Sequence, residues 1–310
     1  MNLLQFHEQF PDEKSCRVYL KVQREKAGLT CDKCGCQKHY WLDAIEKWQC
    51  ANCRCRKNLR SGTIMGKSKL SVKMWFMAMH LMTSTKKSFS ALEMQRQLGM
   101  KFYEPVWYMM QKIRKTMGKR DSGYKLDGAI EIDDAFFEIV NVVEKDEFGN
   151  PKENKRGRGT KGKMKVLVLV ESKPNPAQKS RHKKDRSMGF VKMKVMDELN
   201  AEGINYEVEH AVRDSAHVIT DGYSGYSLLK YVVDKHTAMK VKPKEAGKKL
   251  PWVHTVISNA KRLFSGVHHS VSKDYIQNYL DEFCYKLNRR GFKSDLFERM
   301  IIAGVSGTWY

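Results

Sequence analysis

The spacing of apolar residues divides the chain into helical and extended parts. From about residue 70 to 120 the apolar positions recur at helical spacing, and beyond residue 128 they alternate as in strands or form short continuous runs. These patterns predict three short helices, then strands, then two further helices. The first helices cover 72–79, 90–99 and 106–117, the strands 129–140, 164–170, 190–195 and 217–221, and the later helices 253–264 and 275–290.

Three strands, a short helix, a fourth strand and later helices match the order of a ribonuclease-H-like fold. We therefore expect an α/β domain with a mixed sheet and flanking helices. In that arrangement acids on the first and fourth strands meet in the middle of the sheet, and Asp133 and Asp221 occupy those strands. Two such carboxylates can hold a pair of Mg2+ or Mn2+ ions that activate an attacking hydroxyl and stabilise a leaving oxygen. Either acid taken alone is equally compatible with an ordinary exposed residue.

Cysteines are crowded into a short segment near the N-terminus. Cys31 and Cys34 form one Cys-x-x-Cys pair, and Cys50 and Cys53 form a second. A two-residue spacer lets both thiolates of a pair reach one ion, and tetrahedral zinc takes four such ligands. The pattern predicts a zinc ribbon whose structural Zn2+ replaces the core that so small a segment lacks. A further cysteine two residues beyond each pair fits this spacing less well and is interpreted as a spare thiol.

Charge indicates the partner. The chain has 310 residues, with 57 Lys and Arg against 35 Asp and Glu, and a formal net charge of +22. Such an excess attracts phosphate backbones, so DNA or RNA is the natural partner, and a merely solvated basic surface is the alternative. Short helices broken by a glycine fit a helix-turn-helix, although a small helical bundle has the same pattern. Candidate DNA contacts are Lys112, Arg114 and Lys115 on its last helix, Arg156, Arg158 and Lys161 in a basic loop, and Arg262 on a later helix.

The remaining sequence features concern compartment and domains. No run approaches the ~20 apolar residues of a membrane span, and the N-terminus lacks the pattern of a secretion signal. We expect a cytoplasmic protein, in which crowded cysteines indicate metal rather than disulfides.

The sequence divides into predicted domains. These are an N-terminal helix and zinc ribbon at 1–65, a helix-turn-helix domain at 66–122, a catalytic domain at 123–292 with a basic insertion at 145–188, and a C-terminal tail at 293–310.

Several short motifs are spread over nearly the whole chain. Besides the ribbon they include Ser61-Gly62-Thr63-Ile64, Glu131-Ile132-Asp133-Asp134, Thr220-Asp221-Gly222-Tyr223, Ile257-Ser258-Asn259-Ala260-Lys261-Arg262, Gly266-Val267-His268-His269 and Asn288-Arg289-Arg290. Together they resemble DDE-type transposases of bacterial insertion sequences, in the ISXO-like group that joins a zinc ribbon to a ribonuclease-H-like catalytic domain. No single motif is specific by itself.

The resemblance implies roles for individual residues. Asp133 and Asp221 match the first two catalytic, metal-binding acids. Asn259 matches the third position, in the Asp-Asp-Asn variant of the group, and its amide oxygen can ligate a hard cation without adding charge. Lys261 matches a basic residue that contacts the DNA end.

Other residues compete for these roles. His254 is a rival third metal ligand because it lies nearly two helical turns before Lys261. Glu282 is a more distant rival. Asp134 points to the opposite side of its strand from Asp133 and is interpreted as a supporting or surface acid.

The resemblance also implies an activity. It describes an enzyme that binds transposon ends, cleaves the strand at the end, and transfers the 3′-hydroxyl into target DNA by two-metal phosphoryl transfer. Such an enzyme works on double-stranded DNA as a homodimer or higher assembly and is associated with the bacterial nucleoid. Two alternatives stay open. One is a catalytically inactive DNA-binding regulator derived from a transposase, and the other is a structure-selective nuclease on the same fold.

Overall fold

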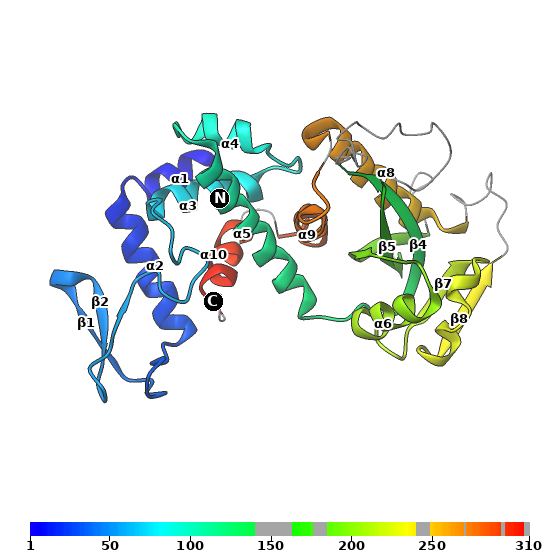
Figure 1. Cartoon of the computed structure of the whole chain (residues 1–310), viewed down its shortest axis with the longest axis horizontal. Coiled ribbons are helices and arrows are strands. Elements are labelled where there is room, and N and C mark those ends of the chain that lie inside the picture. The colour runs from blue at the N-terminus through cyan, green and yellow to red at the C-terminus, as the bar shows by residue number, and fades with distance from the viewer. Residues whose placement is uncertain (140–162, 176–184, 240–248, 270, 293–294, 307–310) are drawn as a thin grey trace, which may run out of the picture. The chain divides into compact units, whose positions relative to one another are not determined.

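The computed structural model describes residues 1–139, 163–175, 185–239, 249–269, 271–292 and 295–306 (Figure 1). The chain divides into two compact units. The first consists of Met1–Arg120 together with Arg289–Tyr310, and the second is Asp121–Asn288. Within the described ranges, none of the helices combines the length and the apolar character that a membrane crossing requires.

The first unit combines a small sheet with helices from both ends of the chain. Its strands form an antiparallel sheet in the order β1-β2-β3, around the two cysteine pairs. The predicted ribbon, the predicted helical domain and the predicted C-terminal tail therefore belong to one compact body, because the tail forms a helix that packs on α3 and α2. The elements are α1 (Leu3–Gln9), α2 (Glu13–Ala27), β1 (His39–Leu42), β2 (Lys47–Cys50), β3 (Arg56–Asn58), α3 (Val72–Ser84), α4 (Ala91–Gln97), α5 (Tyr103–Ser122) and α10 (Leu296–Val305).

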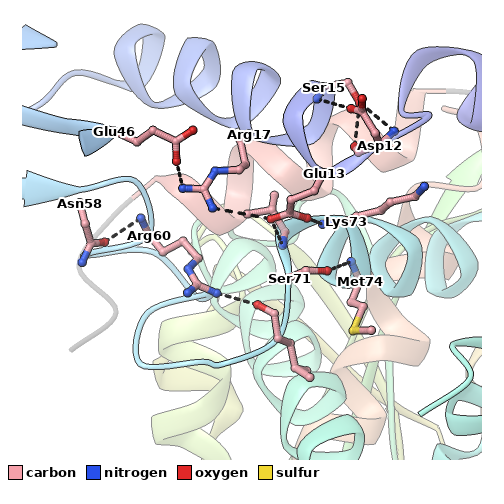
Figure 2. A network of polar contacts seen from close by, with 12 residues as sticks. Asp12, Glu13, Ser15, Arg17, Glu46, Asn58, Arg60, Ser71, Lys73 and Met74 are labelled. Atoms are coloured by element: carbon pink, nitrogen blue, oxygen red, sulfur yellow. Dashed lines mark hydrogen bonds and ion pairs between the residues drawn. The ribbon is translucent and has the colours of Figure 1, made fainter. Parts of the chain in front are cut away.

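A polar network ties α2 to its neighbours in this unit (Figure 2). The carboxylate of Glu13 accepts hydrogen bonds from the backbone N–H groups of Val72 and Lys73, at 2.9 and 2.8 Å. These are first-turn amides of α3, which have no partner within their own helix. Arg17 lies 3.8 Å from Glu13 and also pairs with Glu46 in the ribbon. One helix thus connects the ribbon with the helices that follow it.

The second unit is built on a five-stranded mixed sheet. Its strand order is β6-β5-β4-β7-β8, in which β4, β5 and β6 pair antiparallel, and β7 and β8 run parallel to β4. This order confirms the predicted α/β fold, with a three-stranded meander and a fourth strand beside the first. The last strand, β8, was not predicted. The elements are β4 (Ala129–Glu138), β5 (Lys163–Pro174), β6 (Arg186–Met196), α6 (Ala201–Ala211), β7 (His217–Asp221), β8 (Lys235–Met239), α8 (Pro251–Leu263) and α9 (Ile276–Asn288).

Each face of this sheet has its own hydrophobic core. Side chains alternate between the faces, so the even-numbered valines of β5 face one core and its odd-numbered leucines face the other. One core is closed by α8 and α9, and the other by α6 (Figure 1). Alternation along β4 therefore places residues 131, 133, 135 and 137 on the α8 face, and 130, 132 and 134 on the α6 face.

Candidate functional site

The two predicted acids lie on neighbouring parallel strands. β4 pairs with β7 so that Ala129 lies opposite His217 and Glu131 lies opposite Ile219. Continued for two residues along both strands, this register brings Asp133 opposite Asp221. Both residues then belong to the face of the sheet that α8 covers. The sequence alone could place each acid on a strand, and the pairing of β4 with β7 brings them together.

Asp133 occupies an environment that disfavours its charge. Its side chain is 14% exposed. Burial, followed by the nearby carboxylates of Asp134 and Asp221, raises its pKa to about 7. Two groups act in the other direction, because the backbone N–H of Asp134 donates to Oδ1 at 2.9 Å and Lys261 supplies positive charge. A buried carboxyl whose pKa is raised further by the negative charge of its neighbours suits a bound cation.

The acid on β7 is held by a turn at the strand end. Oδ1 of Asp221 accepts a hydrogen bond from the backbone N–H of Tyr223 at 3.0 Å, which is the geometry of an Asx turn. Its charge also contributes to the raised pKa of Asp134, for which burial is the larger cause. Asp134 belongs to the opposite face of β4, as the alternation of the strand requires.

Helix α8 brings His254 to Asp133. Nδ1 of His254 lies 3.5 Å from Oδ2 of Asp133. The other ring nitrogen, Nε2, is buried and has no hydrogen-bond partner among the described residues. Burial lowers the pKa of the imidazole, and the negative charge of Asp221 opposes this shift less strongly. The ring therefore faces Asp133 through Nδ1, while Nε2 is buried without a partner.

The other candidates on α8 lie differently. Asn259 is exposed, and its Oδ1 accepts a hydrogen bond from the guanidinium of Arg262 at 3.1 Å. Five residues along a helix correspond to a rotation of roughly 140° from His254. Lys261 is exposed, and its positive charge offsets part of the rise in the pKa of Asp133 and, on the other face, of Asp134. Lys261 therefore acts electrostatically on the acids, whereas Asn259 faces its own helix neighbour.

Glu282 lies elsewhere in the second unit. It is buried on α9 and forms an ion pair with Lys286 at 3.5 Å. α9 packs against β6, the edge strand two places away from β4. No set of three His, Cys, Asp or Glu side chains around Asp133 closes to within 4.8 Å among the described residues. The acids therefore leave coordination positions for other ligands.

The four predicted zinc ligands come together in the first unit. The Sγ atoms of Cys31, Cys34, Cys50 and Cys53 all lie within 4.8 Å of one another, with Cys31 to Cys53 at 3.5 Å and Cys34 to Cys50 at 3.6 Å. A tetrahedron with Zn–S bonds of ~2.3 Å has edges of ~3.8 Å, so the spacing fits a four-thiolate zinc site. Backbone N–H groups, that of Cys53 first, lower the pKa of Cys50 to about 6 and favour the thiolate that zinc binds.

The two extra cysteines have a backbone role. The carbonyl of Cys36 accepts a hydrogen bond from the N–H of Cys31, and the carbonyl of Cys55 accepts one from the N–H of Cys50, both at 2.9 Å. Each bond closes the turn that carries one cysteine pair. The Cys36 thiol contacts the carbonyl of Lys38 at 3.7 Å. Their thiols stay outside the four-sulfur cluster, in agreement with the interpretation as spares.

The predicted DNA contacts on α5 need a correction. Arg114 is fully buried, and its guanidinium donates to the carbonyl of Phe89 at 3.3 Å, so it is unavailable to a ligand at the surface. Lys112 is half-buried and donates to the carbonyl of Gly66 at 3.1 Å, whereas Lys115 is exposed. Arg156, Arg158 and Lys161 lie outside the described residues, as does most of the predicted insertion.

An exposed stripe on α5 combines the predicted residue Lys115 with two residues that the sequence analysis did not single out. Tyr108, Lys115 and Lys119 are all exposed, and Tyr108 is 58% accessible. Spacings of seven and four residues keep the three side chains on one side of a helix. The turn before this helix contains Gly99 with a φ of 61°, a left-handed conformation that glycine adopts without strain. Helical spacing was a sufficient signal for this stripe, because the buried residues of α5 follow the complementary positions.

Comparison with known proteins identifies a relationship for the second unit. Residues 125–288 match the family described as the ISXO2-like transposase domain. No curated protein matches the chain. Two solved structures are similar at 14% identity: the Mos1 mariner paired end complex with Mn covers 72% of this chain and 76% of its own, with a TM-score of 0.29. The Mos1 strand transfer complex covers 76% and 78%, with a TM-score of 0.27.

Proposed function

The chain belongs to the ISXO2-like transposase family, and from that premise we propose that it is an active DDE-type DNA transposase. It binds the ends of its own element, cleaves the strand at each end, and transfers the freed 3′-hydroxyl into target DNA. The observation that supports this most directly is the pair Asp133 and Asp221, on neighbouring parallel strands and on the face of the sheet that α8 covers.

The donors at this site suit Mg2+ or Mn2+. Hard cations take carboxylate oxygens, and Mg2+ is commonly held by one or two carboxylates together with substrate phosphates rather than by a closed protein cage. Asp133 and Asp221 supply the carboxylates, and DNA phosphates would complete the coordination. Bound ions would supply an activated hydroxyl for attack and stabilisation of the leaving oxygen. Burial is the main cause of the raised pKa of Asp133, and the negative charges of Asp134 and Asp221 add to it; a bound cation would offset both effects.

The third ligand is proposed to depend on whether DNA is bound. His254 is the nearer candidate in the free protein, because its Nδ1 lies 3.5 Å from Asp133. The two acids and this ring do not close into a ligand set within 4.8 Å, so we propose that the ring moves toward the acids when a metal ion binds. Asn259 is the residue that the family resemblance favours, but Arg262 occupies its amide oxygen. A DNA phosphate that attracts Arg262 would free this oxygen. We infer that Asn259 joins the site only when DNA is present.

Exposed basic residues of both units are proposed to hold the DNA. Lys261 places positive charge beside the acids, where it meets the phosphates of the DNA end. On α5 the exposed stripe of Tyr108, Lys115 and Lys119 follows a turn typical of helix-turn-helix proteins, whose second helix contacts DNA. Cutting two ends together requires two active sites, so we propose a dimer or higher assembly on DNA.

The test is a cleavage and joining assay with labelled element-end DNA and Mg2+ or Mn2+. Wild-type protein should nick the end and join its 3′-hydroxyl to a target, and Asp133→Asn and Asp221→Asn should do neither while still binding DNA. Glu138→Gln serves as the control, because Glu138 is an exposed acid at the end of the same strand. Equal cleavage by Asp133→Asn and wild type would refute the catalytic assignment.

The same assay separates the alternatives. Specific binding of the ends without any metal-dependent cleavage would indicate a regulator derived from a transposase. Cleavage of branched DNA without a joined product would indicate a structure-selective nuclease. A strand-transfer product that disappears in both aspartate variants is expected of the proposed transposase alone.

A further inference from the structure

Glu131 is a buried acid on the same strand as Asp133. It is 3% exposed and lies two residues before Asp133, on the same face of β4. Its Oε2 atom accepts hydrogen bonds from the backbone N–H groups of Trp252 and Val253, at 2.8 and 3.0 Å. Those amides belong to the first turn of α8, more than a hundred residues further along the chain. A single carboxylate oxygen therefore joins β4 to the start of α8.

Helix α8 depends on this oxygen for its N-terminus. The first-turn N–H groups of a helix have no partner inside the helix and are usually satisfied by an N-cap side chain. In α8 the N-cap is Leu250, which makes no side-chain bond, and Pro251 has no N–H to satisfy. The next two amides are the ones that Glu131 accepts, and the N–H of His254 already bonds to the carbonyl of Leu250 at 3.4 Å. Glu131 thus completes the cap. Burial raises the pKa of its carboxyl, and the two amide hydrogen bonds of the helix N-terminus oppose this shift.

The geometry at this cap links directly to the proposed active site. Asp133 follows Glu131 by two residues on β4, and His254 directly follows the second capped amide on α8. The cap therefore ties the strand to the helix within one or two residues of the contact between Asp133 and His254, which measures 3.5 Å. Ile257 and Ala260 of α8 pack into the core on this face and hold the rest of the helix.

We propose that Glu131 is a positioning residue, which fixes the start of α8 on β4 so that His254 and the basic end of the helix face the acids in a productive arrangement. This inference rests on the proposed transposase activity, which it extends. Glu131 touches neither DNA nor metal in this proposal and acts through the placement of α8. Displacing a catalytic group by about 1 Å can lower a reaction rate on the order of 10²-fold.

The chain offers a matched control for loss of a buried acid. Glu171 on β5 is also 3% exposed, and its carboxylate accepts two backbone N–H bonds, from Asp127 at 3.0 Å and Phe190 at 2.9 Å. It holds other segments of the same unit together and, among the described residues, has no bond to α8. Replacing either acid removes two hydrogen bonds to backbone N–H groups, and Glu171→Ala also removes the ion pair with Lys173 at 3.0 Å. Both changes therefore destabilise the unit, but only the change at 131 releases the helix that carries His254.

The experiment compares Glu131→Ala, Glu131→Gln and Glu171→Ala in the full chain. Amide hydrogen exchange, measured without DNA, should become faster at Trp252 and Val253 in Glu131→Ala only. End cleavage at saturating DNA should fall on the order of 10²-fold in Glu131→Ala, with partial recovery in Glu131→Gln because its amide oxygen can still accept. Glu171→Ala should stay close to wild type at a temperature where all variants are folded.

The double variant Glu131→Ala with His254→Ala adds a readout that general destabilisation would not move. If Glu131 acts through α8, the loss in the double variant should be smaller than the product of the two single losses. Independent losses, or an equal loss in Glu171→Ala, would overturn the positioning role. If Glu131→Ala does not fold, Glu131→Gln replaces it in the comparisons with Glu171→Ala and with the His254 double variant. A wild-type protein that cleaves no DNA refutes the proposed function, and hydrogen exchange then still decides whether Glu131 anchors α8.

Discussion

His80 is buried within the aromatic core of the first unit. Its ring stacks on Phe6 with centroids 4.6 Å apart and meets Phe297 edge-on at 5.8 Å, and the residue is 3% exposed. Burial lowers its pKa to about 4, so the ring is neutral at neutral pH. Its Nδ1 is buried and has no hydrogen-bond partner in the part of the chain that the structure describes. His80 therefore packs in this core as a neutral ring, and its protonation in acid would disturb the packing.

We expect the first unit to lose stability as the pH falls from about 6.5 to about 4. In this window the unfolded chain binds a proton at His80 that the folded chain excludes, so acid favours unfolding, by up to roughly 3 kcal/mol. His80→Phe should remove this part of the pH dependence. Urea unfolding at acidic and neutral pH measures it, with exposed His210→Ala as the control. An unchanged pH slope in His80→Phe would contradict the explanation.

The two rivals on α8 can be separated by their dependence on DNA. His254→Ala should weaken activation by Mn2+ and slow end cleavage, because it removes the ring that lies 3.5 Å from Asp133. Asn259→Ala should leave Mn2+ binding by the free protein unchanged and should lower cleavage only once DNA is bound. Calorimetric titration of Mn2+ with and without end DNA measures both effects. Equal loss of Mn2+ affinity in both variants without DNA would contradict the proposed order.

At the scale of elements, the zinc ribbon has little core of its own. Trp48 is its large buried side chain, at 1% exposure, and its indole N–H donates to Glu25 of α2 at 3.2 Å. Arg24 lies over the same ring, 5.0 Å from its centroid, and donates to the carbonyls of Asn58 and Leu59. The ribbon is therefore held by α2 on one side and by the cysteine cluster on the other.

Removing zinc should open the ribbon and leave the second unit folded. Chelation, or Cys50→Ser, should shift the emission of Trp48 to longer wavelength, because a four-thiolate site supplies folding energy that the small sheet lacks. Metal analysis should give one zinc per chain in wild type and in Cys55→Ser, whose thiol lies outside the cluster. Loss of zinc from Cys55→Ser to the same extent as from Cys50→Ser would disprove the ligand assignment.

Elements that carry their own periodicity could be predicted from the sequence. Residues 129–138 combine apolar alternation with acids and residues 166–170 are continuously apolar, and both lie in strands, β4 and β5, that pair antiparallel as expected. β8 could not be found in this way, because its sequence Lys-His-Thr-Ala-Met has no alternating apolar face. It becomes a strand through its parallel pairing with β7. A partner far along the chain supplies what the local pattern lacks.

The candidate site was predictable to a similar extent. The acids of the two strands are visible in the sequence, but their meeting depends on the parallel pairing of β4 with β7. The burial of Arg114 was readable, since it lies four residues after buried Met110 on the same helical face. The cap by Glu131 was not readable, because it joins residues 121 positions apart. Long-range polar contacts of this kind need the fold.

At the scale of the whole molecule, the chain leaves its first unit and returns to it. The segment that follows the second unit forms α10, which packs on α3 and α2. Phe297 of this helix is 3% exposed, and its ring lies 5.5 Å from Phe6, 5.8 Å from Phe10 and 5.9 Å from Phe76. The N-terminal helices therefore complete their core with residues that follow the second unit along the chain.

Phe297→Ala should destabilise the first unit by about 3–5 kcal/mol, the usual cost of removing a buried aromatic ring. Ile302→Ala on the same helix is the control, because Ile302 is 43% exposed and little packing is lost. Hydrogen exchange followed by mass spectrometry can report on both units in one sample. Exchange should rise throughout α1, α2 and α3 in Phe297→Ala, whereas the sheet of the second unit should stay protected. Equal exchange in the two variants would show that α10 rests on the first unit without supporting its core.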